Sequence, residues 1–285
     1  MGRKRASRRE RVRGRGTRLC RRDVDILLAL AKMRLLRTTA LTRLFFSAKG
    51  TCQKRMRKLF DAGLVRAVVS GVADENRFAL TKLGHTLLAE TALEAPLATY
   101  RPAPRVDHRS VQHLDLLNEF RIAVALSVAE AGLELRAFVP DWELRAQDTQ
   151  AALVPDALVA LARPESDRQT VLALEVDTGS MTPGIVAKKV VRYRERRALG
   201  QKVFGAVPHA VVLLVRTERR ARSVARQIVA TSGEGAAPIV LLGLERELLG
   251  DGGVSGGLRT PKDLLATGNQ QLATGRHIGI QKLVH

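Results

Sequence analysis

Two apolar runs in the second half of the chain have the length and composition of buried β-strands. They occupy residues 153–161 and 170–177, and both are rich in valine and leucine. The polar segment between them, residues 163–169, contains a proline directly after its first residue, which favours a hairpin loop. Folding the two runs about Ser166 places Asp156 opposite the end of the second run, where Glu175 lies.

Three carboxylates gather at this end of the predicted hairpin. Because side chains alternate between the two faces of a strand, Glu175 and Asp177 share a face and Val176 points to the other. Like charges this close repel each other, and a bound cation would relieve that repulsion. The alternative is that Asp156 caps the start of a strand, while Glu175 and Asp177 are solvated strand-end residues.

The first third of the chain has helical spacing followed by a hairpin pattern. Apolar residues recur at helical spacing from Asp23 onward, again after Thr38, and again in a helix from Thr51 that ends at Gly63. We expect strands at 64–69 and 76–80, joined by a turn at 70–75, and then a helix capped by Thr81.

The rest of the chain alternates between helical and strand patterns. We expect a long helix from about residue 110 to Gly132, a strand at 133–139, a turn at 140–143, the hairpin described above, and a loop at 178–184. A helix to residue 199, a strand at 209–215, a helix at 218–231 and a strand at 237–243 follow. The domains predicted are a disordered basic arm (1–22), a first domain (23–95), a linker (96–109), a second domain (110–249) and a glycine-rich tail (250–285).

Charge indicates the class of partner. The chain of 285 residues has 48 Lys and Arg against 28 Asp and Glu, a net charge of +20. The arm alone has eleven basic residues and one acid, so it cannot bury a core and is suited to neutralising phosphates. An anionic polymer is therefore the expected partner, nucleic acid before membrane.

Cysteine content and hydropathy exclude other classes. The two cysteines, Cys20 and Cys52, form no ligand-like cluster, so neither a zinc site nor a disulfide framework is expected. No run approaches the roughly 18 apolar residues of a membrane span, and no signal peptide is recognised. A cytoplasmic, nucleoid-associated protein is expected, and the pattern leaves open whether it forms a homodimer.

The order of three helices, a hairpin and a helix resembles a winged helix-turn-helix domain. The sequence Leu-Phe-Asp-Ala-Gly-Leu-Val at 59–65 and Leu-Thr-Lys-Leu-Gly at 80–84 carry this resemblance. It implies that the third helix enters the major groove of double-stranded DNA and that Arg77 belongs to the wing. The implied DNA-contacting residues are Thr51, Gln53, Lys54, Arg55, Arg57, Lys58 and Arg77. A protein-binding winged helix with a solvated basic face is the alternative.

The second domain resembles the PD-(D/E)xK restriction-endonuclease-like fold, which makes the whole chain an α+β or α/β protein. Pro155-Asp156 and Glu175-Val176-Asp177 carry the resemblance. Together with the winged helix, the segment from His113 to Arg121 and a Lys-Lys…Arg-Tyr helix, they resemble the replication-relaxation family of plasmid and mobile-element proteins. The resemblance implies that Asp156 and Glu175 bind Mg²⁺, with the backbone carbonyl of Val176 assisting, and that Glu119 is a further ligand.

The third signature position departs from that pattern. It is normally a lysine, and here it is Asp177, which cannot stabilise developing negative charge. Asp177 could ligate a second metal ion, or Lys188 or Lys189 could reach back from the following helix. Three functions follow from these patterns: a metal-dependent DNA endonuclease or nickase for plasmid or mobile-element replication or mobilisation, a non-catalytic transcription or replication regulator with a degenerate nuclease fold, and an RNA-binding or ribosome-associated protein. The absence of aromatic stacking motifs disfavours the last of these.

Overall fold

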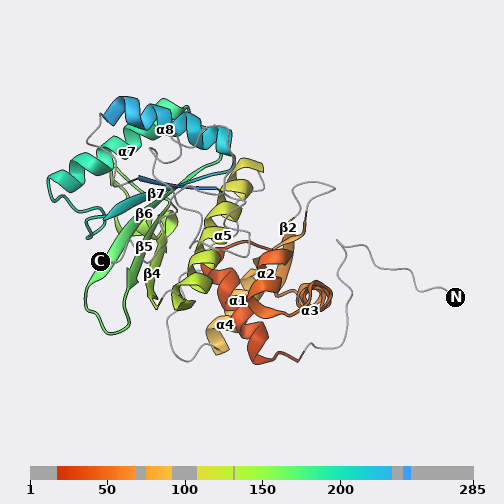
Figure 1. Cartoon of the computed structure of the whole chain (residues 1–285). Coiled ribbons are helices and arrows are strands. Elements are labelled where there is room, and N and C mark those ends of the chain that lie inside the picture. The colour runs from red at the N-terminus through yellow and green to blue at the C-terminus, as the bar shows by residue number, and fades with distance from the viewer. Residues whose placement is uncertain (1–17, 69–74, 92–107, 131, 233–239, 245–285) are drawn as a thin grey trace. The chain divides into compact units, whose positions relative to one another are not determined.

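The contacts between residues divide the chain into two units, Met1–Asn118 and Glu119–His285. A computed structural model describes residues 18–68, 75–91, 108–130, 132–232 and 240–244 of this chain (Figure 1). The division falls inside a helix, α5 (His108–Glu130), whose first eleven residues therefore belong to the first unit. Most of the predicted arm, the turn of the first hairpin, most of the predicted linker and the glycine-rich tail lie outside the described residues.

The first unit consists of helices and a small antiparallel sheet. Its three strands are ordered β1-β3-β2, and Val65 of β2 pairs with Leu80 of β3. Besides the start of α5, its elements are α1 (Arg21–Met33), β1 (Leu36–Arg37), α2 (Thr38–Phe45), α3 (Lys49–Asp61), β2 (Val65–Val68), β3 (Arg77–Leu80) and α4 (Lys82–Thr91).

The junction between α3 and the hairpin is fixed by two glycines and a threonine. Gly63 has a positive φ of 79°, which terminates α3 at little steric cost. The Thr81 hydroxyl accepts a hydrogen bond from the Gly84 N–H at 3.0 Å, as expected of the predicted helix cap. A Cβ atom at Gly84 would lie 2.2 Å from the carbonyl oxygen of Leu64, so only glycine permits α4 to approach β2 this closely.

The second unit is built on a mixed five-stranded sheet, ordered β4-β5-β6-β7-β8. The pairs β4–β5 and β5–β6 are antiparallel, whereas β6–β7 and β7–β8 are parallel. Figure 1 shows α7 and α8 together on one side of this sheet. The elements after α5 are β4 (Glu134–Pro140), α6 (Asp141–Gln147), β5 (Ala157–Ala162), β6 (Gln169–Asp177), α7 (Pro183–Ala198), β7 (Ala210–Val215), α8 (Glu218–Ser232) and β8 (Val240–Leu244).

The three central strands are buried on both faces, which explains their continuous apolar runs. On the face covered by α7 and α8, Leu213 and Val215 of β7 pack with Val186 and Val190 of α7. Alternation along β6 puts Glu175 and Asp177 on this same face, because their β7 partners in the register are Leu213 and Val215. The sheet therefore directs both carboxylates of β6 toward the two helices.

Sequence pattern predicted the order of elements well and some boundaries poorly. The turn expected at 140–143 is wrong, because Asp141–Gln147 forms α6, whose cap N–H at Asp148 bonds to the Leu144 carbonyl. The two-residue strand β1 was not expected, since its pairing with Phe78 and Arg77 is entirely non-local. Helix α1 begins at Arg21 rather than Asp23, with Asp23 accepting a hydrogen bond from the Cys20 N–H.

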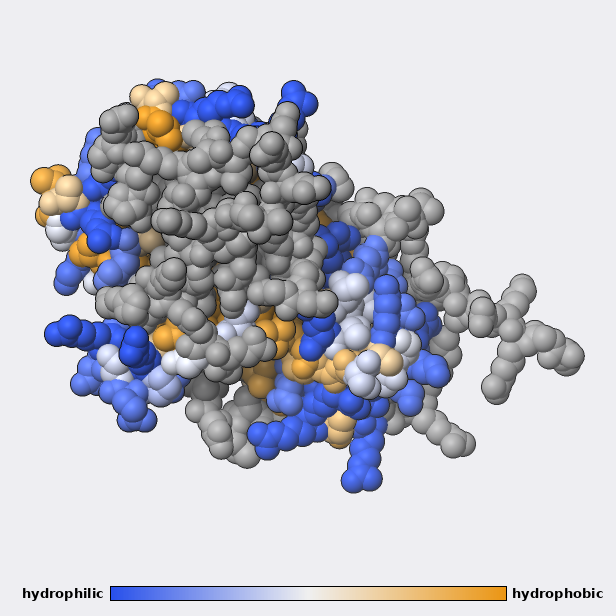
Figure 2. Space-filling view, in the orientation of Figure 1, coloured by the Kyte–Doolittle hydropathy of each residue, from blue (hydrophilic) through white to orange (hydrophobic). Residues whose placement is uncertain are grey.

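The described surface carries the polar character expected from the composition. On the face drawn in Figure 2 the described residues are mostly hydrophilic, and apolar residues occur in small groups. Among the helices that the structure describes, none has both the length and the apolar character needed to cross a bilayer.

Candidate functional site

Asp156 and Glu175 lie beside each other at one end of the β5–β6 pair. Asp156 directly precedes β5, and the pairing of Ala157 with Leu174 brings it next to Glu175. The Asp156 Oδ2 atom accepts a hydrogen bond from the Val176 N–H at 2.7 Å, so the side chain replaces a backbone acceptor at the end of the ladder. This bond holds the Asp156 carboxylate against the strand segment that contains Glu175.

Glu175 is buried and has two protein donors from α7. Its side chain is 6% exposed, the Lys189 Nζ atom lies 2.5 Å from Oε2, and the Tyr193 hydroxyl donates to Oε1 at 2.6 Å. Lys189 and Tyr193 are four residues apart, so one face of α7 presents both groups to the same carboxylate. Burial and the neighbouring charge of Asp156 raise the pKa of Glu175 to about 7, although Lys189 and Tyr193 act in the opposite direction.

This raised pKa predicts a pH-dependent stability. Because the folded protein keeps the Glu175 proton to higher pH than an unfolded glutamate with a pKa of 4.5, the free energy of unfolding should fall as pH rises between these values. The expected fall is as much as about 3 kcal/mol at roughly 1.4 kcal/mol per pKa unit. Urea denaturation at pH 5 and pH 8 measures it, and Glu175→Gln should remove most of the difference. An equal difference in wild type and variant would contradict the assignment.

Asp177 is also buried, and its side-chain partner comes from a different helix. Its Oδ1 atom accepts from the Gly179 N–H at 2.8 Å, and the Arg220 Nε atom of α8 donates to its Oδ2 atom at 2.7 Å. Arg220 also donates to the carbonyl of Met181 at 2.5 Å. Asp177 and Arg220 thus tie the loop after β6 to the start of α8.

Two other residues predicted for this site are Lys188 and Glu119. Lys188 is exposed on α7, whereas its neighbour Lys189 reaches Glu175. Glu119 is buried on α5. Within the described parts of the chain, no three His, Cys, Asp or Glu side chains form a group that could hold a metal ion. The roles of Tyr193 and Arg220 were missed, although the spacing of Lys189 and Tyr193 could have suggested a shared partner.

In the first unit, α3 presents a polar face. Its apolar side, which includes Cys52, Met56 and Leu59, is buried. Lys49 and Gly50 at its start are exposed, and so are Thr51, Gln53, Lys54 and Lys58. We call the last four residues the α3 face.

Two arginines predicted to contact DNA from α3 bind carboxylates of the protein. The Arg55 Nε atom donates to the Asp23 Oδ1 atom at 2.6 Å, and its Nη2 atom bonds to Oδ2. Burial by itself would raise the pKa of Asp23, but hydrogen bonds from Arg55 and the Cys20 backbone lower it below its ordinary value. Arg57 bonds to Asp61 at 3.0 Å. Arg55 therefore joins α3 to α1, and its contact with DNA stays a prediction.

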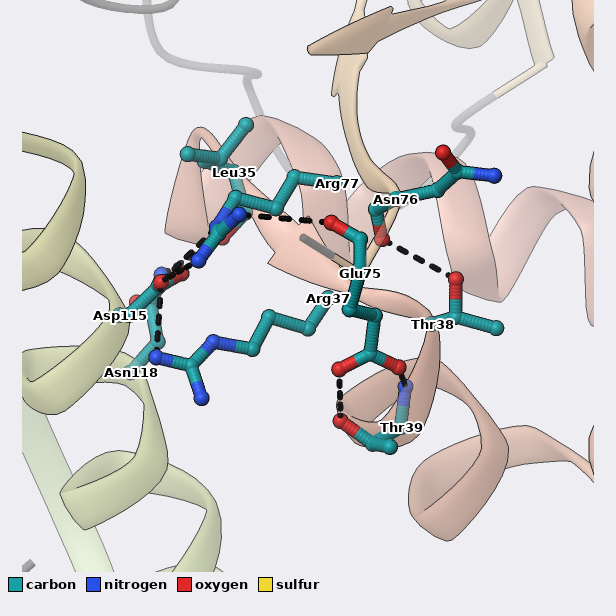
Figure 3. Close-up of polar contacts among 9 residues, drawn as sticks. All are labelled: Leu35, Arg37, Thr38, Thr39, Glu75, Asn76, Arg77, Asp115 and Asn118. Carbon is teal, nitrogen blue, oxygen red and sulfur yellow. Dashed lines mark hydrogen bonds and ion pairs between the residues drawn. The ribbon is translucent and has the colours of Figure 1, made fainter. Parts of the chain in front are cut away.

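Arg77 also binds a carboxylate of the protein. Its side chain is 8% exposed and donates through Nε to the Asp115 Oδ2 atom at 2.8 Å, and Arg37 reaches the same oxygen at 2.8 Å (Figure 3). Asp115 lies on α5 and is 1% exposed. A wing contact to DNA would require Arg77 to leave this buried ion pair, so the contact stays a prediction that the pairing disfavours.

Two further polar contacts surround this ion pair. The Asn118 side chain donates to the carbonyls of Met33 at 3.1 Å and Leu35 at 2.7 Å. The Glu75 carboxylate accepts from the backbone N–H and the hydroxyl of Thr39, at 2.7 and 2.9 Å, and so caps the start of α2 (Figure 3). The start of α5 and the base of the hairpin are therefore fastened to the same short segment of the first unit.

These features define a mixed α/β protein with N-terminal helices and a small antiparallel sheet, followed by a mixed sheet that holds a carboxylate, lysine and tyrosine cluster. The chain belongs to the Replication-relaxation family, whose model matches residues 27–209. No curated protein matches it. Among solved structures it is similar to restriction endonuclease FokI, with a TM-score of 0.30 and 13% identity over 80% of this chain and 42% of the FokI chain. A likeness this distant carries no argument.

Proposed function

We propose that this protein binds double-stranded DNA through the first unit, acting as a winged helix in plasmid or mobile-element replication or mobilisation. The α3 face supports this proposal most directly. It presents Lys54 and Lys58 on an exposed helix side beside Thr51 and Gln53, side chains that reach phosphates and base edges. The net charge of +20 provides the long-range attraction to DNA.

The second unit is proposed to be a PD-(D/E)xK nuclease-like domain that nicks or cleaves DNA with Mg²⁺. Asp156 and Glu175 would hold the ion, with the Val176 carbonyl assisting. Two adjacent carboxylates suffice for Mg²⁺, which protein sites bind through one or two carboxylates together with substrate phosphates. Their mutual repulsion, which helps to raise the pKa of Glu175, would be relieved by a cation. When bound, Mg²⁺ supplies polarisation of the phosphodiester and a more acidic water molecule.

Lys189 is proposed to take the role of the missing signature lysine. Its ammonium group already lies 2.5 Å from Glu175, although it comes from α7 rather than from the strand. An ammonium group at this place can stabilise the negative charge that develops on the phosphate. The two donors on Asp177 favour a structural role for that carboxylate over binding of a second metal ion.

A second candidate function is a non-catalytic transcription or replication regulator with a degenerate nuclease fold. It is favoured by the contacts of Glu175, because Lys189 and Tyr193 between them engage both carboxylate oxygens. In that case the cluster would stabilise the sheet against α7 and perform no chemistry.

Nicking of supercoiled plasmid separates these two functions. We expect wild-type protein with Mg²⁺ or Mn²⁺ to convert supercoiled plasmid into the open circular form, and Asp156→Ala to lose this activity while still binding DNA. Binding by both proteins is measured in parallel by fluorescence anisotropy with a labelled duplex. Tight binding that leaves the plasmid intact would support the regulator, and metal-dependent nicking retained by the variant would contradict the role of Asp156.

A further inference from the structure

A basic cleft adjoins Asp156, Glu175, Lys189 and Tyr193, which we call the Glu175 cluster. It has a volume of about 380 Å³ and lies between α6, α7 and the segment that precedes β5. Its lining residues are Arg145, Ala151, Ala152, Leu153, Val154, Ile185, Lys188, Lys189 and Arg192. We call this the α7 cleft.

The charge of the α7 cleft has one sign. Four of its lining residues are basic, and none of the others is acidic. Lys189 is paired with Glu175, and Arg145 lies 3.6 Å from Asp141. Lys188 and Arg192, by contrast, have no ion-pair partner in the part of the chain that the structure describes. Two cations that share a recess without a protein counterion favour an anionic ligand.

Helical spacing explains how one helix serves both the cluster and the cleft. Val186, Val190 and Tyr193 of α7 are buried, whereas Ile185, Lys188 and Arg192 form an exposed stripe at intervals of three and four residues. A second hollow of about 330 Å³ continues along this stripe and shares Ala152, Leu153 and Arg192 with the cleft. The two hollows together follow the exposed side of α7.

We propose that the α7 cleft binds the sugar–phosphate backbone of the DNA strand on which the Glu175 cluster acts. Lys188 and Arg192 would contact phosphates, and the apolar wall of Leu153, Val154 and Ile185 would lie against the sugars. A volume near 380 Å³ has room for a small part of one strand but not for a duplex. Because Lys189 belongs to both the cleft and the cluster, a strand held in the cleft lies next to Glu175. The proposal rests on the nuclease function proposed above.

A pair of matched variants tests the cleft. The cleft variant carries Arg145→Gln, Lys188→Gln and Arg192→Gln. The control variant carries Arg168→Gln, Arg219→Gln and Arg226→Gln, which removes the same charge from exposed arginines of the same unit outside the cleft lining. Binding of a labelled single-stranded oligonucleotide is measured over a range of salt concentrations for wild type and both variants.

The cleft variant should bind the strand about 10- to 100-fold more weakly than wild type at low salt. Its slope of log affinity against log salt should fall by about 1.4, since Lys188 and Arg192 are the two proposed phosphate contacts and each lost single-strand contact accounts for roughly 0.7. The control variant should lose less than a third of this slope change. Equal losses in the two variants would overturn the proposal. A mononucleotide that binds wild type as tightly as the oligonucleotide does, and that loses this binding in the cleft variant, would also overturn the proposal. The ligand of the cleft would then be a free nucleotide.

Duplex binding distinguishes failure of the cleft from failure of the proposed function. A variant with Lys54→Gln and Lys58→Gln should lose duplex affinity through the α3 face. If duplex binding depends on that face and the two triple variants bind the strand alike, only the cleft proposal is overturned. If wild type binds neither duplex nor strand, DNA binding as the proposed function falls, and the cleft proposal falls with it.

Discussion

Replacing Asp115 by alanine is expected to destabilise the first unit by about 3–5 kcal/mol, the usual cost of removing one partner from a buried ion pair. Asp115 is 1% exposed and receives both Arg77 and Arg37 at 2.8 Å. Without its carboxylate, the guanidinium group of Arg77 would remain buried without its counterion. Urea denaturation of the full chain, with amide hydrogen exchange of β2 and β3 reporting on the first unit, measures the loss.

A matched control uses a partly exposed pair of the same unit. Asp61→Ala removes a carboxylate that bonds to Arg57 four residues earlier, where both side chains are partly exposed, and should cost less than about 1 kcal/mol. Asp115→Asn keeps the shape and one acceptor oxygen, so it should fall between the alanine variant and wild type. A loss below 1 kcal/mol for Asp115→Ala would show that Arg77 finds another partner and that the ion pair does not hold the hairpin base.

The second large effect is expected at Lys189. If its ammonium group stabilises the charge that develops on the phosphate, Lys189→Met should lower the rate of plasmid nicking by about 100- to 1,000-fold at saturating DNA, as removal of one such charge-stabilising donor does elsewhere. Lys189→Arg keeps the positive charge and should recover part of the rate. Single-turnover nicking with Mg²⁺, at DNA concentrations above the Kd of each variant, measures the effect.

Two other lysines separate a role in rate from a role in affinity. Lys188→Met should weaken DNA binding and leave the rate at saturating DNA within a few fold, because Lys188 faces the cleft and not Glu175. Lys202→Met, at an exposed position after α7, should change neither quantity. A Lys189→Met variant that nicks DNA at the wild-type rate would exclude Lys189 from the chemistry and leave it as a partner of Glu175 alone.

The sequence left open whether Lys188 or Lys189 of the following helix reaches Glu175, and the folded chain shows that Lys189 does. The motif places the third residue two positions after Glu175, and Asp177 stands there. In the folded chain Arg220 binds that position, and the ammonium group beside Glu175 comes from α7. A helix that packs across a strand can present a side chain to the same place as a neighbouring strand residue. The spacing of residues along the sequence does not predict how a helix packs on a strand.

Several features of this protein were determined by the sequence alone. The apolar periodicities predicted the order of elements, because they must match the face that each helix or strand buries. Gly63 and Thr81 marked helix ends, because their effects act within one turn of chain. The net charge and the exposed side of α3 followed from residue types and helical spacing alone. The motifs that carry the family resemblance also lie in short continuous segments.

Only the tertiary structure decided which charged residues face solvent and which face each other. Arg55 and Arg77 have the same side chain as any DNA-contacting arginine, but the buried carboxylates of Asp23 and Asp115, 32 and 38 residues away, hold them in ion pairs. In the same way, Lys189 and not Lys188 contacts Glu175. Successive residues of α7 point in different directions, so Lys189 reaches Glu175 whereas Lys188 lines only the cleft. Such pairings depend on distances between segments that are remote in sequence, and residue spacing carries no information on those distances.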